Sequence, residues 1–254
     1  MNCGRKIGPF DCCSVVQGDC LELMKQLPDG AVDAVITDPP YFTNECRGGK
    51  PERGSFRHKW TGLLKESDPS QGILQSVTWG DFEADLYRIC QDGSNCYICT
   101  NDKNIATTIN CAVSAGWKLH NILVWIKDNG TPNRWYMKNG EFVVYLFKPP
   151  STPIPRLNSM TCNFYPMVRD KVHPTQKPIE WLGLMAANCG QLILDPFCGS
   201  GSTLVAATRI NKHYLGFESS PEYCALARKR LAETEAIPMW AREETHDETP
   251  SMFS

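Results

Sequence analysis

The chain has 254 residues, of which 42% are hydrophobic and 21% charged. These values suit one globular α/β domain with a sizeable core. No apolar run is long enough to span a membrane and the N-terminus lacks the apolar segment of a secretion signal, so we expect a cytoplasmic protein. The formal net charge of −2 provides no general attraction to nucleic acid, which would need local basic patches.

Periodicity and turn residues predict seven strands that mostly alternate with helices. The strands cover residues 13–17, 32–37, 95–100, 120–127, 141–148, 192–195 and 213–217, and the helices cover 20–27, 81–91, 102–115, 178–189, 202–210 and 221–234. This alternation is typical of a mostly parallel sheet covered on both faces. The strands over 120–127 and 141–148 have a short connection and are expected to be antiparallel neighbours.

The most informative early stretch is AVITDPPY. A strand over 32–37 runs into Asp38, and Pro39 and Pro40 cannot continue a ladder. The stiff turn holds two acceptors, the Asp38 carboxylate and the Pro39 carbonyl, beside the Tyr41 ring. A planar group with an exocyclic NH2 could stack on this ring and donate both protons. A strand that ends in a proline-rich loop with a capping Asp is the plainer interpretation.

Two long segments without clear periodicity, 42–78 and 149–172, are rich in basic residues. In the first, aromatic residues are mixed with the basic ones, which suits a phosphate backbone and unstacked bases. A charged stretch is more often simply solvated. The candidate DNA-contacting residues are Arg47, Lys50, Arg53, Arg57, Lys59, Arg156 and Arg169.

The 13 cysteines are odd in number and irregular in spacing. Cys96 and Cys99 form a CxxC within a strand-like run, where alternation directs the two thiols to opposite faces. No second ligand pair has the spacing of a zinc site, so we expect no metal. We interpret the cysteines as small buried hydrophobic residues and expect no disulfide framework.

Four predicted strands end in an acid at the same relative place: Asp19, Asp38, Asp195 and Glu218. In open α/β sheets, ligands bind beyond the carboxyl ends of the strands. The four acids are therefore expected to line one crevice. A single acid in this position is usually a helix cap, and Asp19 with Glu22 forms a capping-box pattern.

A glycine-rich turn, PFCGSGST, follows the strand that ends at Asp195. Gly199 and Gly201 allow a ligand to approach the backbone closely, and the helix that follows favours an anionic group at its N-terminus. Leu204 occupies the place of a third glycine, so the dinucleotide pattern is incomplete. Glu218 closes the next strand, where an acid meets ribose hydroxyls. The acids favour a ligand with a ribose and positive charge.

Three motifs carry a family resemblance: DPPY at 38–41, HPTQKP at 173–178 and DPFCGSGST at 195–203. Together they resemble the S-adenosylmethionine-dependent DNA amino-methyltransferases of the β, or permuted, class, in which the DPPY element comes first. The resemblance covers about residues 12–235. It implies a Rossmann-like seven-stranded sheet, mostly parallel with one antiparallel strand, in which LILD and YLGFE are the first two strands and VVQGD and AVITD the third and fourth.

The resemblance also implies roles for individual residues. Asp38, Pro39, Pro40 and Tyr41 would hold the target base. For the cofactor, Asp195 would lie near the methionine amino group, Glu218 would bind the ribose, and Asp19 would accept a hydrogen bond from the adenine. Phe197, Gly199 and Gly201 would surround the methionine part, and Thr175 and Lys177 would approach its carboxylate.

Asp before Pro-Pro-Tyr is more frequent in adenine-modifying members, which favours N6-methylation of a flipped adenine in double-stranded DNA. Cytosine N4 is the alternative, because the same pocket chemistry serves both amino groups. An RNA adenine methyltransferase, a protein glutamine methyltransferase and a catalytically silent nucleic-acid-binding module are the remaining alternatives. A homodimer is frequent in this class.

We expect a single methyltransferase domain over 1–237 and a disordered acidic tail over 238–254. Larger members of the family carry a sizeable target-recognition region. Here only the segments 42–78 and 149–172 are available for that purpose.

Overall fold

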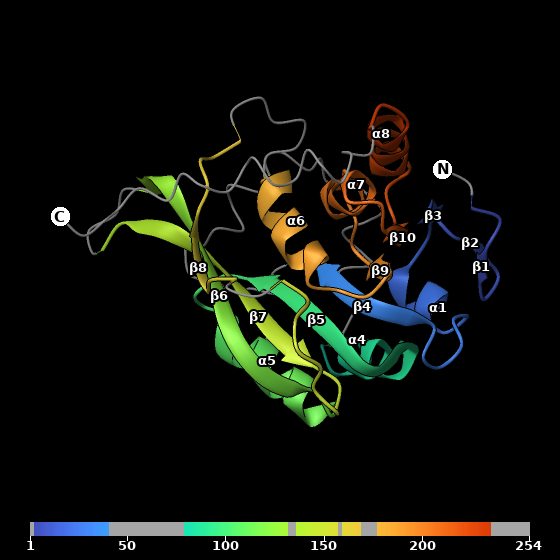
Figure 1. Cartoon of the computed structure of the whole chain (residues 1–254), viewed down its shortest axis with the longest axis horizontal. Helices are drawn as coiled ribbons and strands as arrows, with labels where there is room; N and C mark the ends of the chain where they lie inside the picture. Colours follow the sequence, from blue (N-terminus) through green and yellow to red (C-terminus); the bar gives the residue numbers. More distant parts are fainter. Residues whose placement is uncertain (1–2, 41–78, 132–135, 157–158, 169–176, 235–254) are drawn as a thin grey trace, which may run out of the picture.

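The computed structural model describes residues 3–40, 79–131, 136–156, 159–168 and 177–234 (Figure 1). Within these ranges, no helix combines the length and apolar character that crossing a bilayer requires.

One eight-stranded sheet forms the centre of the molecule, with the strand order β3-β10-β9-β4-β5-β7-β6-β8. Its strands are β3 (Ser14–Gln17), β4 (Val32–Thr37), β5 (Cys90–Thr100), β6 (Lys118–Thr131), β7 (Lys138–Phe147), β8 (Cys162–Phe164), β9 (Leu192–Asp195) and β10 (His213–Glu218). Strand β7 runs antiparallel to both neighbours, and all other pairs are parallel. A two-stranded hairpin, β1 (Lys6–Ile7) and β2 (Phe10–Asp11), lies beyond β3.

The predicted fold class and all seven predicted strands are confirmed. Strands β9, β10, β3 and β4 occupy the places expected for the first to fourth strands of the permuted sheet. Strands β6 and β7 are antiparallel neighbours, also as expected. Strand β8 was not predicted, because its three residues are too few to give a periodic signal. Strand β5 begins five residues before its predicted start, because Gly93 at φ +82° interrupts the pattern.

Helices cover both faces of the sheet (Figure 1). They are α1 (Cys20–Met24), α4 (Trp79–Ile89), α5 (Ile105–Ser114), α6 (Ile179–Ala187), α7 (Ser202–Arg209) and α8 (Pro221–Ala232). The apolar sides of α1, α4 and α5 form one core, and those of α6, α7 and α8 form the other. Cys96 belongs to the first core and Cys99 to the second, so the predicted alternation is confirmed.

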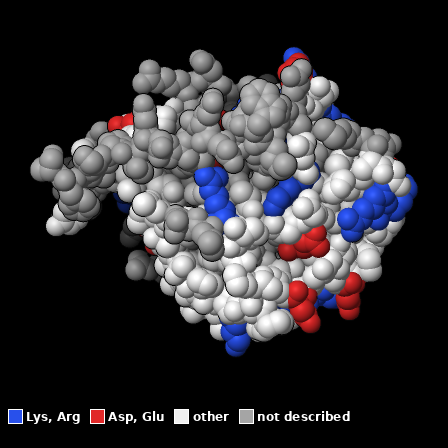
Figure 2. All heavy atoms as spheres, in the orientation of Figure 1, with Lys and Arg blue, Asp and Glu red and all other residues white. Residues whose placement is uncertain are grey.

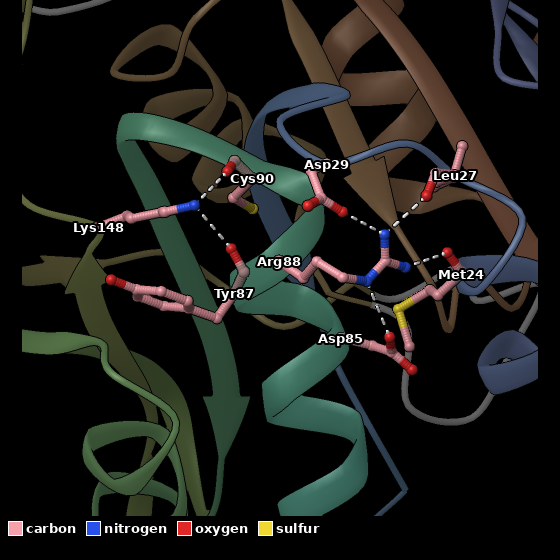
Figure 3. A network of polar contacts seen from close by, with 8 residues as sticks. All are labelled: Met24, Leu27, Asp29, Asp85, Tyr87, Arg88, Cys90 and Lys148. Atoms are coloured by element: carbon pink, nitrogen blue, oxygen red, sulfur yellow. Dashed lines mark hydrogen bonds and ion pairs between the residues drawn. The ribbon is translucent and has the colours of Figure 1, made fainter.

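The C-terminal ends of α1 and α4 lie at the amino edge of the sheet and are held by two cations (Figure 3). The Arg88 guanidinium donates to the carbonyls of Met24 and Leu27, each at 2.8 Å. The Lys148 ammonium donates to the carbonyls of Tyr87 at 3.1 Å and Cys90 at 2.8 Å. The last carbonyls of a helix lack intrahelical partners and carry partial negative charge, so these cations stabilise both helix ends.

Candidate active site

The DPPY and G-x-G elements meet at the carboxyl edge of the sheet. Strand β4 ends at Thr37, strand β9 ends at Asp195, and the two strands pair in parallel. The hydroxyl of Thr37 donates to Asp195 Oδ1 at 2.9 Å. Asp38 therefore follows a strand end that is hydrogen-bonded to the start of the glycine-rich turn. This juxtaposition is the one that the family resemblance predicts.

Asp195 is a buried acid with 3% of its surface exposed. Its Oδ1 also accepts from the backbone NH of Phe197 at 3.1 Å. Burial raises the pKa of Asp195 to about 7, although hydrogen bonds from Thr203 and Thr37 oppose the shift. A buried carboxyl group with a raised pKa favours a nearby positive charge, because that charge stabilises the ionised form.

The glycine-rich turn is shaped by two glycines with left-handed backbone conformation. Gly199 has φ +49° and Gly201 has φ +82°. A Cβ at Gly199 would meet no atom of the described residues within 4 Å, so among these residues the backbone is open to a ligand there. A Cβ at Gly201 would come to 3.0 Å from the Cβ of Ala227, so this glycine lets α7 and α8 approach each other. Helix α7 begins directly after Gly201.

Glu218, at the end of β10, is fixed by the backbone around it. Its Oε2 accepts from the NH of Gly199 at 3.0 Å, and its Oε1 accepts from the NH of Ser220 at 2.8 Å. Burial raises the pKa of Glu218, and these backbone hydrogen bonds partly oppose the shift. The carboxylate is therefore oriented beside the open backbone of Gly199.

Asp19 lies near the same edge, because the NH of Gly18 donates to the carbonyl of Glu218 at 2.9 Å. The Asp19 carboxylate caps α1 by accepting from the NH of Leu21 at 2.9 Å. Glu22 forms an ion pair with Lys25 at 2.7 Å. Asp19 is thus the N-cap of α1, whereas the Glu22 carboxylate pairs with Lys25.

Phe197 lies on the other side of the turn. Its ring packs against Phe82 of α4 with centroids 5.1 Å apart. Phe197 is partly buried against the core that contains α1 and α4. This contact fixes the first residue of the turn after Asp195 and Pro196.

A row of alternating charges crosses the edge next to Asp38. Lys177, only 6% exposed, forms ion pairs with Asp38 and, at 3.3 Å, with Glu141. Glu141 also pairs with Lys127. Burial alone would raise the pKa of Glu141, but the ammonium groups of Lys177 and Lys127 outweigh it and the pKa is lowered. Lys177 thus contacts the DPPY acid, whereas its expected contact with the cofactor carboxylate stays a prediction.

Thr37, Glu141 and Lys127 were not predicted from the sequence. The predicted acids lie at the ends of strands, whereas Glu141 lies near the beginning of one. Strand β7 is antiparallel, however, and the residue after Glu141 pairs with Thr100 at the end of β5. An acid near the start of an antiparallel strand therefore faces the same edge as acids that end parallel strands. The predicted β6–β7 pairing contained this signal.

Several candidate residues lie outside the described ranges. These are Tyr41, Thr175, Arg47, Lys50, Arg53, Arg57, Lys59 and Arg169. Pro39 is buried and Pro40 half-buried. Arg156 is exposed, and its backbone NH donates to Asn188 at 3.0 Å. On the face in Figure 2, the described basic residues form separate groups among uncharged and acidic ones.

The comparisons with known proteins agree with this geometry. Residues 32–229 match the model of a DNA methylase family, the N6 and N4 methyltransferases. Because this match covers most of the chain, the protein belongs to that family. It is a DNA methyltransferase that uses S-adenosylmethionine.

Individual relatives span nearly the whole chain. The type II methyltransferase M2.MboI of Moraxella bovis is 26% identical, and the alignment covers 87% of this chain and 88% of the relative. The crystal structure of the M1.HpyAVI–SAM complex has a TM-score of 0.62 at 22% identity, covering 86% of this chain and 98% of that one. The cytosine-N4-specific PvuII DNA methyltransferase has a TM-score of 0.65 at 16% identity, covering 88% and 94%. The two structural likenesses establish the fold.

Proposed function

We propose that this enzyme methylates the exocyclic N6 of adenine in double-stranded DNA, with Asp38 and the Pro39 carbonyl as the acceptors that hold the target amino group. The observation that carries the proposal is the hydrogen bond between Thr37 and Asp195, which joins the DPPY element to the glycine-rich turn. When bound, S-adenosylmethionine supplies an electrophilic methyl group on a sulfonium. Binding and orientation of the reacting groups come from side chains and backbone groups at the carboxyl edge of the sheet.

The described residues fit this cofactor. A ribose offers two hydroxyl donors, and the oriented Glu218 carboxylate is a suitable acceptor for them. The ammonium group of the methionine part suits Asp195, whose buried carboxyl group is stabilised in its ionised form by a positive charge. Gly199 allows close approach to the backbone. Asp19, Phe197, Gly201, Thr175 and Lys177 remain proposed cofactor contacts.

The proposed role of Asp38 is to orient the amino group and to disperse the positive charge that develops on it. An amino group conjugated to a ring is a poor nucleophile, because its lone pair is delocalised into the ring. Two acceptors that bind its protons turn the lone pair out of the ring plane. Preorganised groups of this kind supply much of an enzyme's acceleration. The ion pair with Lys177 fixes the Asp38 carboxylate before the base arrives.

The target base must leave the duplex, at a cost of a few kcal/mol. Stacking on Tyr41 would offset about 1–3 kcal/mol of that cost. We propose the segments 42–78 and 149–172 as the DNA-contacting parts of a single domain over 1–237, with 238–254 as a disordered tail and with a homodimer as a compatible assembly. The triple variant Arg53→Ala, Arg57→Ala, Lys59→Ala should weaken DNA binding and reduce its salt dependence. An unchanged salt slope would exclude the first segment.

Cytosine N4 is the second candidate, because the same two acceptors serve that amino group and the structurally similar PvuII enzyme is cytosine-N4-specific. A direct test incubates the protein with methyl-labelled cofactor and matched pools of DNA, RNA and protein. Digestion of the labelled DNA and mass spectrometry of its nucleosides then separates N6-methyladenine from N4-methylcytosine. Label in N4-methylcytosine would overturn the proposed base, and label in RNA alone would overturn the proposed polymer.

A further inference from the structure

A cluster of three thiols and one imidazole lies at the sheet edge opposite the active site. Cys3, Cys12, Cys13 and His213 offer one ligand atom each, and these atoms all lie within 4.8 Å of one another. They come from three separate parts of the chain: the N-terminus, the end of the β1–β2 hairpin and the first residue of β10. The proposed methyltransferase reaction uses none of these four residues.

Two of the distances within the cluster match those of a tetrahedral zinc site, and the other ligand pairs all lie within 4.8 Å. With Zn–S near 2.3 Å and Zn–N near 2.0–2.1 Å, two sulfur ligands lie about 3.8 Å apart and a sulfur and a nitrogen about 3.5 Å. The Cys12 and Cys13 sulfurs are 3.7 Å apart. The Cys13 sulfur lies 3.5 Å from Nδ1 of His213. These separations therefore need little adjustment to accept the ion.

The backbone adopts an uncommon conformation to bring the adjacent thiols together. Cys13 has φ +60°, although it is not a glycine. In an extended strand, consecutive side chains point to opposite faces, so Cys12 and Cys13 would diverge. Left-handed conformation at a residue with a Cβ costs on the order of 1–2 kcal/mol. Two cysteines that only fill a hydrophobic core do not need side chains that point toward each other, whereas two ligands of one metal ion do.

Backbone hydrogen bonds of the hairpin place Cys3 next to Cys12 and Cys13. The NH of Cys12 donates to the carbonyl of Arg5 at 2.9 Å, and the NH of Cys13 donates to the carbonyl of Tyr214 at 2.8 Å. The first bond brings the N-terminal strand back beside Cys12, and the second attaches the hairpin to β10. A two-stranded hairpin is marginally stable by itself. A shared ligand set would fasten it to the sheet.

We propose that Cys3, Cys12, Cys13 and His213 bind a structural zinc ion. Three thiolates and one neutral imidazole form a closed set of the kind that leaves no position for water or substrate. The thiol protons are released to solvent when the ion binds. His213 begins β10 and Glu218 ends it, a separation of about 16 Å at 3.3 Å per residue. The ion would stabilise the hairpin and the adjoining sheet edge without touching the active site.

Sequence spacing concealed this site. Cys13 and His213 are 200 residues apart, and the two adjacent cysteines do not resemble a CxxC pair. The expectation of no metal rested on local spacing alone, which detects only ligands that lie close together in the chain. The fold brings the fourth ligand from the strand that follows α7.

The test uses the full chain without an affinity tag, expressed with zinc available and kept reduced. Elemental analysis should give one zinc per chain, and replacement by Co²⁺ should give the visible absorption of tetrahedral thiolate coordination. Cys3→Ser changes an exposed side chain, so the variant should fold, and it should lower zinc affinity about a hundredfold or more, beyond the 10–100-fold typical of indirect ligand partners. His213→Ala should do the same. Cys162→Ser, an exposed cysteine on β8, is the matched control and should keep the ion.

Three outcomes would overturn the proposal. One is a chain without stoichiometric zinc whose thiols all titrate as free after incubation with excess zinc. A second is an intact mass 2 Da lower under non-reducing conditions with no metal bound, which would mean that two of the thiols form a disulfide. Retention of full zinc affinity by both Cys3→Ser and His213→Ala would place the ion elsewhere and overturn it as well.

Discussion

Charged groups at the two edges of the sheet are satisfied in opposite ways. At the amino edge, Arg88 and Lys148 donate to fixed peptide carbonyls at the ends of α1 and α4 (Figure 3). At the carboxyl edge, the buried Asp195 and the half-buried Glu218 lie beside backbone NH groups, and burial raises the pKa of both. The cations of the amino edge are matched by acceptors, whereas at the carboxyl edge burial disfavours the ionised form of two acids, Asp195 and Glu218.

The difference indicates which edge serves stability and which serves binding. Hydrogen bonds from a cation to the carbonyls at a helix end lower the free energy of the folded state. A buried acid with a raised pKa raises the free energy of the folded state when it is ionised, until a cation or hydrogen-bond donor binds to it. Strongly shifted pKa values are for this reason more frequent at functional sites than elsewhere. The cost of burying acids is concentrated where we propose that the cofactor binds.

The largest expected effect comes from removing the acid beside the target base. Asp38→Ala should reduce methylation about a thousandfold, or about 4 kcal/mol of barrier, because one preorganised acceptor for developing charge is lost. Cofactor affinity and the melting temperature should change little. Asp102→Ala removes an exposed acid that pairs with Lys138 and should leave methylation intact. Cofactor affinity is read by calorimetry and methylation by label transfer; more than a tenth of the wild-type rate in Asp38→Ala would contradict the assignment.

The second effect concerns stability at the amino edge. Arg88→Met keeps the length of the side chain but removes the guanidinium donor from the carbonyls of Met24 and Leu27, of which that of Met24 keeps the NH of Leu27 at 3.0 Å. It also removes the ion pairs with Asp29 and Asp85. Loss of hydrogen bonds to a charged group should lower the free energy of unfolding by about 3 kcal/mol. Urea unfolding measures this, and the rate of methylation per folded molecule should be unchanged. Lys229→Met, on an exposed ion pair with Glu233 at 4.0 Å, is the matched control and should cost less than about 0.5 kcal/mol.

The carboxyl edge was largely predictable from sequence, because its information is local. Asp38, Asp195 and Glu218 each follow a recognisable strand, and parallel strands bring such residues to one edge. The family resemblance predicted which strands are the first to fourth of the sheet. The helices were also found, with ends that differ by a few residues, since caps at Asp19 and Ser220 are readable in the sequence.

The parts that could not be predicted depend on contacts between distant segments. Arg88 is not part of a sequence motif. Its partners are Met24 of α1, 64 residues away, and Leu27 in the turn that follows α1, 61 residues away. Lys177 was assigned to the cofactor from its motif, yet its ion pair with Asp38 spans 139 residues. Local patterns give the elements and their direction. They do not say which side chains of neighbouring elements meet.

The third expected effect is a pH dependence of cofactor affinity at the carboxyl edge, caused by the titration of Asp195. The ionised Asp195 is the form that attracts a cationic group, and its pKa is raised to about 7. Below that pH a proton must leave before the cofactor binds, so affinity should fall about tenfold for each unit below pH 7 and level off above it. Calorimetric titration with S-adenosylmethionine from pH 5.5 to 8.5 measures the profile. Asp195→Asn should bind weakly with a flat profile, while Asp102→Asn should keep the wild-type slope.

The smallest effect tests whether the charge row acts through Asp38. Glu141→Gln keeps the size of the side chain but removes the charge that holds Lys177, so the Asp38 carboxylate should be less well oriented and the rate of methylation should fall about fivefold, near 1 kcal/mol. Lys127→Met, which loses contacts with Glu141 and the Trp125 ring, should have a smaller effect.

A double-mutant cycle distinguishes positioning from a general loss of stability. If Glu141 acts on the reaction through Lys177 and Asp38, Glu141→Gln should slow the enzyme fivefold in the wild-type background and hardly at all in Asp38→Asn, because the group that it positions is already impaired. Equal factors in both backgrounds would mean that Glu141 supports only the fold at this edge. Lys177 would then be a structural cation like Arg88, and the contrast between the two edges would be confined to Asp195 and Glu218.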